Sequence, residues 1–457
     1  MDTQRSAETS VRLETAHSTE HEGDRWTAFL AGDCVVGDRV AERPFGESLT
    51  RRMRGSDLTV VNLEGAIRGS AAPLTKYGPL KETSERTPEL LADVGVDAVT
   101  LANNHSMDYG RDGLFETMAA CRDAGIGVCG AGSEITAALS PLYVDVADGA
   151  VSVALIGLCE REFGVATETD PGAAWIDHPE VRGRIETAAT RADVVIVFAH
   201  GGIEYVPISP PARHQRLRSL VEAGADVVVG HHPHVPQGWE RVDGGVIFYS
   251  LGNFLFSQPR RPKTQRGLAL ELTGSGRTPL ALELVPTEIV DGTVREMRNG
   301  SDRRELLDHL RQLTEISEGG ALEAHWQEVA DRIFLQRYSS WLRKAAGGDP
   351  VSMIKQPDLH LRGDGLWDAD RRRSEMLLLL NLVRNESHRS VIETAIELRT
   401  DVGTDRRTPA IESTVRELIS RTEDREVYDQ PSTSGRQFRS LVEQLVPTSP
   451  SGDRSPE

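Results

Sequence analysis

Short apolar runs that end in polar side chains recur along the first two thirds of the chain. Residues 26–33, 57–64 and 97–105 each have the pattern of a strand followed by a carboxylate, an amide or an imidazole. Residues 193–200 form the strongest such run, and residues 227–229 are followed by three histidines within four positions. The pattern predicts buried strands that deliver functional groups at their ends.

Segments with helical spacing separate these runs. Residues 88–94, 113–124 and 211–223 are predicted helices, and residues 126–129 and 151–158 are predicted short strands. Residues 268–272 and 280–285 are expected to complete the sheet. Alternating strands and helices indicate an α/β fold, in which some strands could still be antiparallel.

The pattern divides the chain into four parts. Residues 1–25 are polar and predicted to be a disordered tail, and residues 26–290 are predicted to form the α/β domain. From Asn299 the pattern becomes helical, which predicts a helical domain over residues 299–427 with a buried helix core at 376–383. Residues 430–457 are predicted to be a flexible tail with room for a short helix at 437–445. The expected apolar stripe of the helical part consists of Leu322, Trp326, Val329, Ile333 and Leu342.

Composition excludes several classes of protein. A net charge of −18 and a pI near 5.3 argue against nonspecific nucleic-acid binding. No apolar run approaches the roughly 20 residues of a membrane span, and residues 1–25 do not have the pattern of a signal peptide. We therefore expect a cytoplasmic protein, peripheral to a membrane complex at most. The four cysteines show no C-x-x-C pairing and are expected in the core rather than in disulfides or a zinc ribbon.

Polar residues at or just beyond the predicted strand ends form the candidate site. Carboxylate, amide oxygen and imidazole together suit a divalent cation such as Mn, Fe, Zn or Co better than calcium. A bridging carboxylate would permit two ions, whose shared hydroxide could attack a substrate. The residues are Asp33, Asn62, Glu64, Asn103, Asn104, His105, Asp108, His200, His231, His232, His234 and Asn253.

The three clustered histidines are not expected to be equivalent. In an extended segment His232 and His234 would project to the same side, so each could serve one metal, while His231 would point away. A structural hydrogen bond, or a contact to a ligand residue, is then the expected role of His231. Local alternatives exist for other positions: Asp33 as a turn or cap residue, Asn103 and Asn104 as a turn pair, His105 as a structural histidine and Glu64 as a solvated loop carboxylate.

Six motifs, taken in order, resemble those of the CapA-type poly-γ-glutamate capsule biosynthesis proteins, which belong to the calcineurin-like metallophosphatase superfamily. The resemblance covers about residues 26–287 and implies a two-layered β-sandwich flanked by helices, with a dinuclear metal centre at the strand ends. The motifs are Gly32-Asp33, Asn62-Leu-Glu64, Leu101-Ala-Asn-Asn-His-Ser-Met-Asp-Tyr-Gly110, His200-Gly-Gly-Ile-Glu-Tyr205, Gly230-His-His-Pro-His-Val-Pro-Gln237 and Ser250-Leu-Gly-Asn-Phe254.

The resemblance also implies roles for individual residues. Asp33 and His234 would bind the first metal, and Glu64 would occupy the position of a bridging aspartate. The second metal would be held by Asn104, His200 and His232. His105 would be the general acid that protonates the leaving group, with Asp108 orienting it.

The chain departs from the superfamily pattern at three positions. Val35 stands where a histidine is usual, and Glu64 is longer than the usual aspartate, so the first metal site could be poor or empty. Gly201 replaces the family's usual tryptophan, which would remove a wall beside the substrate. Glu204 and Tyr205 follow in that loop, where the carboxylate could recognise an ammonium group or act as a base, or could be an ordinary surface group.

The leading functional prediction is a metal-dependent hydrolase of a phosphoester or amide, acting on a capsule-like anionic polymer or a related cell-surface glycan. Basic residues between the second and third motifs are candidates for contacting such an anion, or are solvated charges; they are Arg68, Lys76, Lys81 and Arg86. The alternative is a non-catalytic accessory protein of a capsule synthesis complex that binds a metal or the polymer. A third hypothesis gives the helical region a role in oligomerisation or partner docking.

Overall fold

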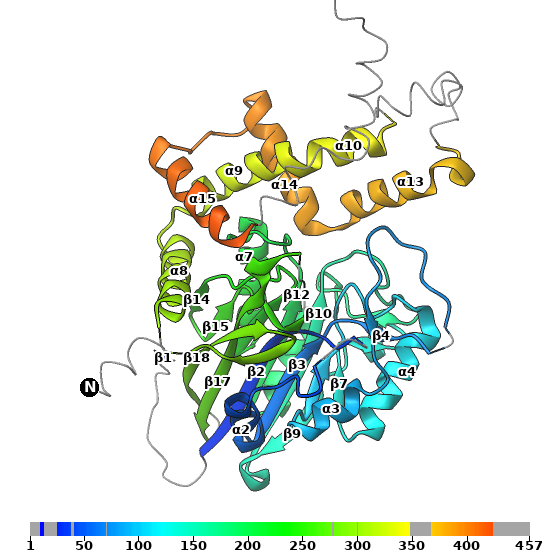
Figure 1. The fold of residues 1–457 in the computed structure, drawn as a ribbon, viewed down its shortest axis with the longest axis vertical. Helices are drawn as coiled ribbons and strands as arrows, with labels where there is room; N and C mark the ends of the chain where they lie inside the picture. The colour runs from blue at the N-terminus through cyan, green and yellow to red at the C-terminus, as the bar shows by residue number, and fades with distance from the viewer. Residues whose placement is uncertain are drawn as a thin grey trace, which may run out of the picture.

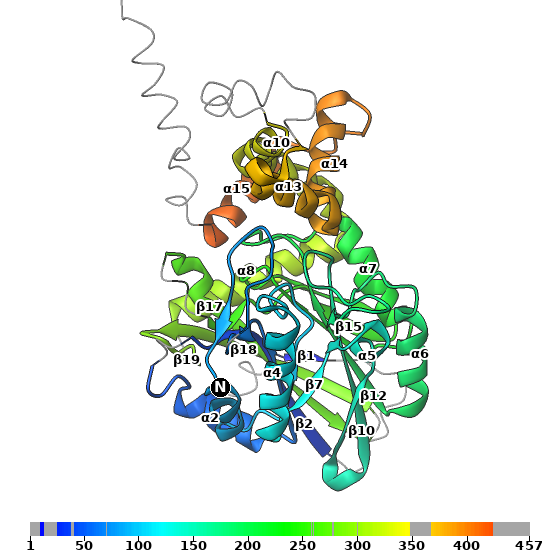
Figure 2. The ribbon, with the colours of Figure 1, turned by 90° about the vertical axis from the view of Figure 1, so that its right-hand side faces the viewer.

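The structure is a computed structural model that describes residues 10–12, 25–37, 41–69, 71–256, 258, 260–276, 278–298, 300–347 and 367–423. Two β-sheets form a sandwich, helices cover its outer faces, and a group of C-terminal helices stands at one end (Figures 1 and 2). The predicted α/β class, with a helical C-terminal region, is confirmed. The two layers also match the sandwich that the motifs implied.

The first sheet has nine strands in the order β1-β18-β17-β2-β3-β6-β7, with β16 beside β2 and β19 beside β18. The strands β2, β3, β6 and β7 are parallel to one another, so their carboxyl ends lie at the same edge. The bounds are β1 (Ser10–Arg12), β2 (Arg25–Val35), β3 (Leu58–Leu63), β6 (Ala98–Thr100), β7 (Gly127–Cys129), β16 (Asn253–Phe256), β17 (Arg266–Ser275), β18 (Thr278–Val290) and β19 (Thr293–Glu296).

The second sheet has six strands in the order β14-β15-β13-β12-β10-β9. Its central strands β10, β12, β13 and β15 are parallel. The bounds are β9 (Leu142–Val146), β10 (Val151–Cys159), β12 (Val194–His200), β13 (Val227–His231), β14 (Trp239–Val242) and β15 (Gly245–Phe248). Two small ribbons pair β4 (Ala66–Ile67) with β5 (Glu82–Thr83) and β8 (Ala131–Gly132) with β11 (Gly172–Ala173).

Alternation of side chains along the strands builds the sandwich. In β2, Leu30 faces the core between the sheets, whereas its neighbour Phe29 faces the helices outside the first sheet. In β12, Ile196 faces the same central core and Val197 faces the helices of the second sheet. Both faces of these strands are therefore covered, which explains their continuous apolar runs.

Three helices pack on the outer face of each sheet. Cores on both outer faces combine strand and helix side chains, such as Leu114 against the first sheet and Leu217 against the second. The first sheet carries α2 (Glu47–Gly55), α3 (Thr87–Asp93) and α4 (Gly110–Asp123); the second carries α5 (Ile135–Ala138), α6 (Val181–Arg191) and α7 (Pro211–Glu222).

The C-terminal helices share a core with loops of the sandwich. Trp326, Val329 and Leu378 pack in one cluster with Ile203 and Val206, which lie in the loop after β12. Figure 1 shows the helices from Leu322 onward, in yellow to red, above the end of the second sheet, and the helix that precedes them beside β14. The bounds are α8 (Ser301–Glu318), α9 (Leu322–Ile333), η3 (Phe334–Tyr338), α10 (Ser339–Ala345), α13 (Ala369–Arg384), α14 (Glu386–Thr400) and α15 (Pro409–Thr422).

Two details of the predicted organisation need correction. The expected buried helix core at residues 376–383 is only partly buried, because Leu378 and Leu382 face inward while Val383 is 58% exposed. Within the tail predicted to be disordered, Ser10–Arg12 forms β1 and pairs with β18; the rest of residues 1–24 lies outside the described residues, as do residues 430–457. Among the described helices, none combines the length and apolar character needed to cross a bilayer.

Candidate metal centre

The candidate site residues meet where parallel strands of both sheets end. Asp33 and Asn62 come from β2 and β3 of the first sheet, and His200 and His231 are the last residues of β12 and β13 in the second. The two sheets are joined here, since Asp33 Oδ1 lies 3.1 Å from His231 Nδ1. The site is thus held between two layers and depends on their packing.

A close backbone contact positions Asp33. Its N–H donates to the carbonyl of Gly252 at 3.0 Å, and Asp33 pairs in register with Asn253, the first residue of β16. A Cβ atom at Gly32 would come within 2.1 Å of the Gly252 carbonyl oxygen. Glycine at position 32 is therefore required for β2 to approach the turn before β16 this closely.

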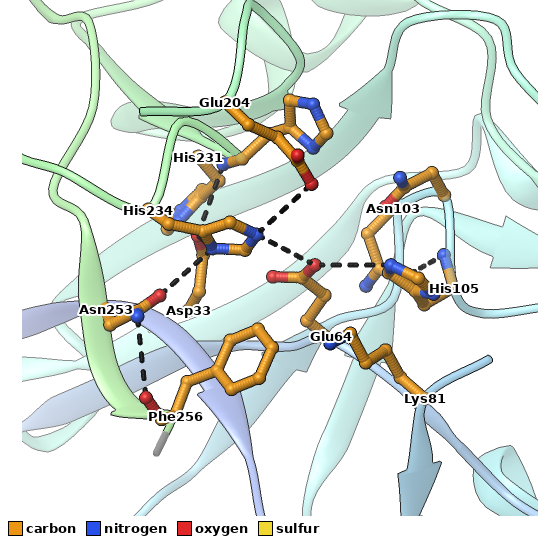
Figure 3. A network of polar contacts seen from close by, with 12 residues as sticks. Asp33, Glu64, Lys81, Asn103, His105, Glu204, His231, His234, Asn253 and Phe256 are labelled. Atoms are coloured by element: carbon orange, nitrogen blue, oxygen red, sulfur yellow. Dashed lines mark hydrogen bonds and ion pairs between the residues drawn. The ribbon is translucent and has the colours of Figure 1, made fainter. Parts of the chain in front are cut away.

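Asp33, Glu64 and His234 form a compact set that we call the first ligand group. One potential ligand atom from each lies within 4.8 Å of the others, and all three side chains are buried. His234 Nδ1 is 3.2 Å from Asp33 Oδ2 and 3.0 Å from Asn253 Oδ1, so two acceptors fix this nitrogen as the protonated one. His234 Nε2 then faces Glu64 Oε1 at 3.8 Å, a separation too long for a hydrogen bond (Figure 3).

The electrostatics of the first ligand group fit a cation. Both carboxylate oxygens of Glu64 are buried without a hydrogen-bond partner, and burial raises the pKa of Glu64 to about 8. Burial would also raise the pKa of Asp33, but hydrogen bonds with His231 and His234 outweigh it and hold this pKa well below its ordinary value. For His234, burial is outweighed by Glu64 and Asp33, which raise its pKa to about 9. A divalent ion would replace the protons on this group and compensate its buried charge.

Asn104, His200 and His232 form a second set, the second ligand group. His200 Nε2 lies 3.1 Å from Asn104 Oδ1 and 3.2 Å from His232 Nδ1. Burial, followed by the neighbouring His232, lowers the pKa of His200 well below its ordinary value, so this imidazole is neutral and has a lone pair for a metal. The structure therefore brings these three side chains together, as the family motifs implied.

Asn62 and Asn103 connect the two ligand groups. Asn62 Nδ2 lies 2.8 Å from Asp33 Oδ1 and 3.2 Å from His200 Nδ1. Asn103 in turn donates to Asn62 Oδ1 at 3.2 Å and to the carbonyl of Leu63 at 2.9 Å. Both amides are spent on holding other site residues, which places them behind the ligand groups.

The histidine loop differs from the extended segment that was predicted. Strand β13 ends at His231, and both His232 (φ 96°) and His234 (φ 58°) lie in the left-handed region. The predicted projection of His232 and His234 to one side of an extended segment is therefore wrong. His231 does not point away from the site either, because its Nδ1 contacts Asp33. It has the expected hydrogen-bonding role, while its buried Nε2 has no hydrogen-bond partner.

His105 and Asp108 form a hydrogen-bonded pair beside Glu64. His105 Nδ1 lies 2.7 Å from Asp108 Oδ2. On the other side of the ring, His105 Nε2 lies 3.7 Å from Glu64 Oε1 (Figure 3). The Lys76 ammonium contacts Asp108 and has a side chain only 4% exposed. Burial, together with the charges of Lys76 and Lys81, lowers the pKa of His105 well below its ordinary value. His105 thus presents Nε2 toward the ligand groups.

Glu204 and Tyr205 lie at the open side of the first ligand group. The Glu204 side chain is 41% exposed, and its Oε1 is 4.0 Å from His234 Nε2. Tyr205 has a left-handed backbone (φ 65°), and its ring centre is 5.9 Å from that of His234. At Gly201 there is no space for a larger side chain, because a Cβ atom there would lie 2.5 Å from the Glu160 side chain.

Several residues of the site region carry no local sequence signal. Glu160 and Arg213 are both buried, and Arg213 Nη1 donates to the Glu160 carboxylate at 3.0 Å. The same carboxylate accepts hydrogen bonds from Gly202 N and from Ser387 Oγ of α14. Phe256 packs against His234 with ring centres 5.1 Å apart. Sequence reasoning missed these residues because their partners lie far along the chain.

The described geometry can be set beside known proteins. Capsule biosynthesis protein CapA of Bacillus anthracis is 29% identical over 341 residues, covering 70% of this chain and 80% of its own. PGA biosynthesis protein CapA of Bacillus subtilis (strain 168) is 29% identical over 327 residues, covering 67% of this chain and 82% of that protein. A solved phosphatase from Mycoplasma pneumoniae is 12% identical with a TM-score of 0.37, covering 62% of this chain and 99% of that protein.

The family described as bacterial capsule synthesis protein PGA_cap matches residues 27–258. This range contains every residue of the two ligand groups, as well as His105 and Asp108. It also spans just over half of the 457 residues. The chain therefore belongs to the PGA_cap family of bacterial capsule synthesis proteins.

Proposed function

We propose that the protein is a metal-dependent hydrolase that cleaves a phosphoester or amide bond during the synthesis or modification of a capsule-like anionic polymer. The observation that carries this proposal is Glu64, a fully buried carboxylate whose two oxygens have no hydrogen-bond partner. It lies between His234 Nε2 at 3.8 Å and His105 Nε2 at 3.7 Å. Such a costly arrangement is typical of a site built for a cation.

Two ions are proposed, each held mainly by one ligand group. Asp33 and His234 would hold one ion, Asn104, His200 and His232 would hold the other, and Glu64 would take the part of the carboxylate that the superfamily shares between them. Mixed oxygen and imidazole donors suit Mn, Fe or Zn. When bound, such ions act as Lewis acids and make a hydroxide nucleophile available at neutral pH.

His105 would transfer a proton to the leaving group. Asp108 holds its Nδ1, which leaves Nε2 directed toward Glu64 and the space beside it. Burial and two lysines lower the pKa of His105, so its imidazole is neutral at pH 7 until it takes up the proton that it would transfer, and once protonated it is a strong acid. Lys76 and the backbone N–H of Lys81 hold Asp108 in turn, so the proton-transferring ring is fixed in one orientation.

The names of the relatives support a capsule-like polymer as the substrate. The two Bacillus proteins are named for capsule or PGA biosynthesis. A Mycobacterium tuberculosis relative, 28% identical over 224 residues, is named a probable polyglutamine synthesis accessory protein. A non-catalytic accessory role is the second candidate, favoured by Val35, which supplies no ligand where the superfamily has a histidine.

Metal content and hydrolysis together test the proposal. Purified protein should bind about two Mn²⁺ per chain and hydrolyse bis(p-nitrophenyl) phosphate or a γ-glutamyl amide. Glu64→Gln, His234→Ala and Asn104→Ala should each lower Mn²⁺ binding and abolish turnover, while the exposed control Arg182→Met should leave both unchanged. Full turnover by the three ligand variants would refute an enzymatic centre here. Polymer binding without turnover in the unaltered protein would favour the accessory role.

A further inference from the structure

Lys81 has an unusual position beside the first ligand group. Its backbone N–H donates to Asp108 Oδ2 at 2.6 Å, which fixes this residue next to the His105 pair. The Lys81 ammonium lies 4.6 Å from the centre of the Phe256 ring, and that ring packs edge-on against His234. Lys81 is only half-buried, and Figure 3 shows it beside Glu64.

Two other cations of this segment are already engaged. Lys76 is buried in contact with Asp108. Arg68 is 54% exposed and pairs with Glu82 at 3.7 Å. By contrast, the Lys81 ammonium forms no hydrogen bond and no ion pair within 4.0 Å with the residues that the structure describes. The face of Phe256 satisfies its charge in part but accepts none of its three N–H bonds in the ordinary way.

Glu64, a nearby negative group, forms no ion pair with Lys81. Glu64 has two buried oxygens without hydrogen-bond partners, and the Lys81 charge acts on it from beyond ion-pair distance. Figure 3 shows Lys81 and Glu204 on opposite sides of Glu64. A ligand at the first ligand group would therefore have an unpaired ammonium on the Phe256 side, where no described side chain competes for it.

We propose that Lys81 binds an oxyanion of the substrate, either a phosphate oxygen or a free carboxylate, next to the bond that is cleaved. This assignment rests on the proposed function, because it places the anion at the same centre. A carboxylate would come from an acidic polymer such as a γ-linked glutamate chain, and a phosphate from a phosphoester. Both offer the hydrogen-bond acceptors that the ammonium lacks.

Calorimetric titration of full-length, Mn²⁺-loaded protein separates the two sources. Inorganic phosphate and the dipeptide γ-glutamylglutamate are titrated into the unaltered protein, Lys81→Met, Lys81→Arg and the control Arg68→Met, which removes a paired cation from the same segment. Lys81→Met should weaken the preferred anion by about tenfold to a hundredfold. Lys81→Arg should retain most of the affinity, and Arg68→Met all of it. If Lys81→Met loses affinity for phosphate alone, the substrate is a phosphoester. If it loses affinity for the dipeptide alone, the substrate is an acidic polymer.

Controls keep this test separate from the proposed function. Mn²⁺ binding by Lys81→Met, measured in the same way, should equal that of the unaltered protein, since Lys81 is not in a ligand group. Equal affinity of the unaltered protein and Lys81→Met for both anions, with Mn²⁺ binding intact, would overturn the assignment of Lys81 alone. Failure of the unaltered protein to bind Mn²⁺ would instead overturn the proposed function.

Discussion

Replacing Arg213 by Met should strongly destabilise the protein, although the residue belongs to neither ligand group. Arg213 is completely buried and donates to Glu160 Oε1 at 3.0 Å and to the carbonyl of Ala199 at 2.8 Å. Methionine keeps much of the volume but leaves the Glu160 carboxylate buried without its main counter-charge. Removal of one member of a buried ion pair typically costs about 3–5 kcal/mol.

The pKa of Glu160 gives a second value for the free energy that its charge pairing contributes to folding. Burial would raise this pKa, but Arg213, then Arg216, outweigh it and lower the pKa from its ordinary value of 4.5 to about 2. A difference of this size corresponds to about 3 kcal/mol in favour of the folded state. Because the pKa is lowered on folding, this stabilisation is present above pH 4.5 and is lost as the pH falls toward 2.

Urea denaturation followed by tryptophan fluorescence measures the effect. At pH 7 the midpoint for Arg213→Met should fall by the equivalent of about 3 kcal/mol. The exposed pair of Arg182 and Glu186 provides the control, since Arg182→Met should change stability by less than about 1 kcal/mol. Adding Glu160→Gln to Arg213→Met should recover part of the loss, because the unpaired charge is gone. Equal midpoints for Arg213→Met and Arg182→Met would show that the buried pair of Arg213 and Glu160 stabilises the protein no more than an exposed pair does.

Three further predictions concern other parts of the chain. Gly32→Ala should cost at least about 1–3 kcal/mol and weaken Mn²⁺ binding, because its Cβ would meet the Gly252 carbonyl at 2.1 Å; Gly55→Ala, with nothing nearby, should be nearly neutral, and equal denaturation midpoints would contradict this. His309→Leu should stabilise the protein, since both ring nitrogens are buried without partners and burial lowers its pKa to about 4. The gain should be larger at pH 5 than at pH 8, because only the unfolded histidine takes up a proton between about 6.5 and 4; a pH-independent gain would count against it. Ser387→Ala should cost about 1.5–3 kcal/mol, measured by urea denaturation, because it removes a hydrogen bond to a buried carboxylate; an unchanged midpoint would show that this bond is dispensable.

Strand positions were predictable because burial on both faces leaves a direct trace in the sequence. The runs that became β3, β10 and β12 are mostly apolar, and nearly every side chain along them is buried. Helix α6 (Val181–Arg191) escaped notice because its inward face consists of Val181, Ile185 and Ala188, too few apolar residues to give a clear period. Local pattern therefore predicts an element best when nearly all its side chains are buried.

The site was partly predictable for a different reason. Parallel strands end at one edge, so polar residues at those ends were expected to meet, and the structure brings Asp33, Glu64 and His234 within 4.8 Å. The left-handed backbone at His232 and His234 was not predictable, because only the sharp turn after β13 requires it. Family motifs gave the expected roles of these positions, whereas the structure alone revealed how they contact one another.

The C-terminal helices contact the loop that carries Glu204 and so help to position part of the site. The loop that carries Glu204 lies between two bodies: Tyr205 N donates to the carbonyl of Pro233 in the histidine loop at 2.8 Å, while Arg337 of η3 donates to the Glu204 carbonyl at 3.4 Å. Ile203 of the same loop packs into the core of the helical region. A protein shortened at residue 299 would lose the helices that cover Ile203 and would release the loop. Loss of activity or of a partner on truncation would therefore report on the site itself, so the docking hypothesis is better tested by substitutions on the exposed outer face of α13.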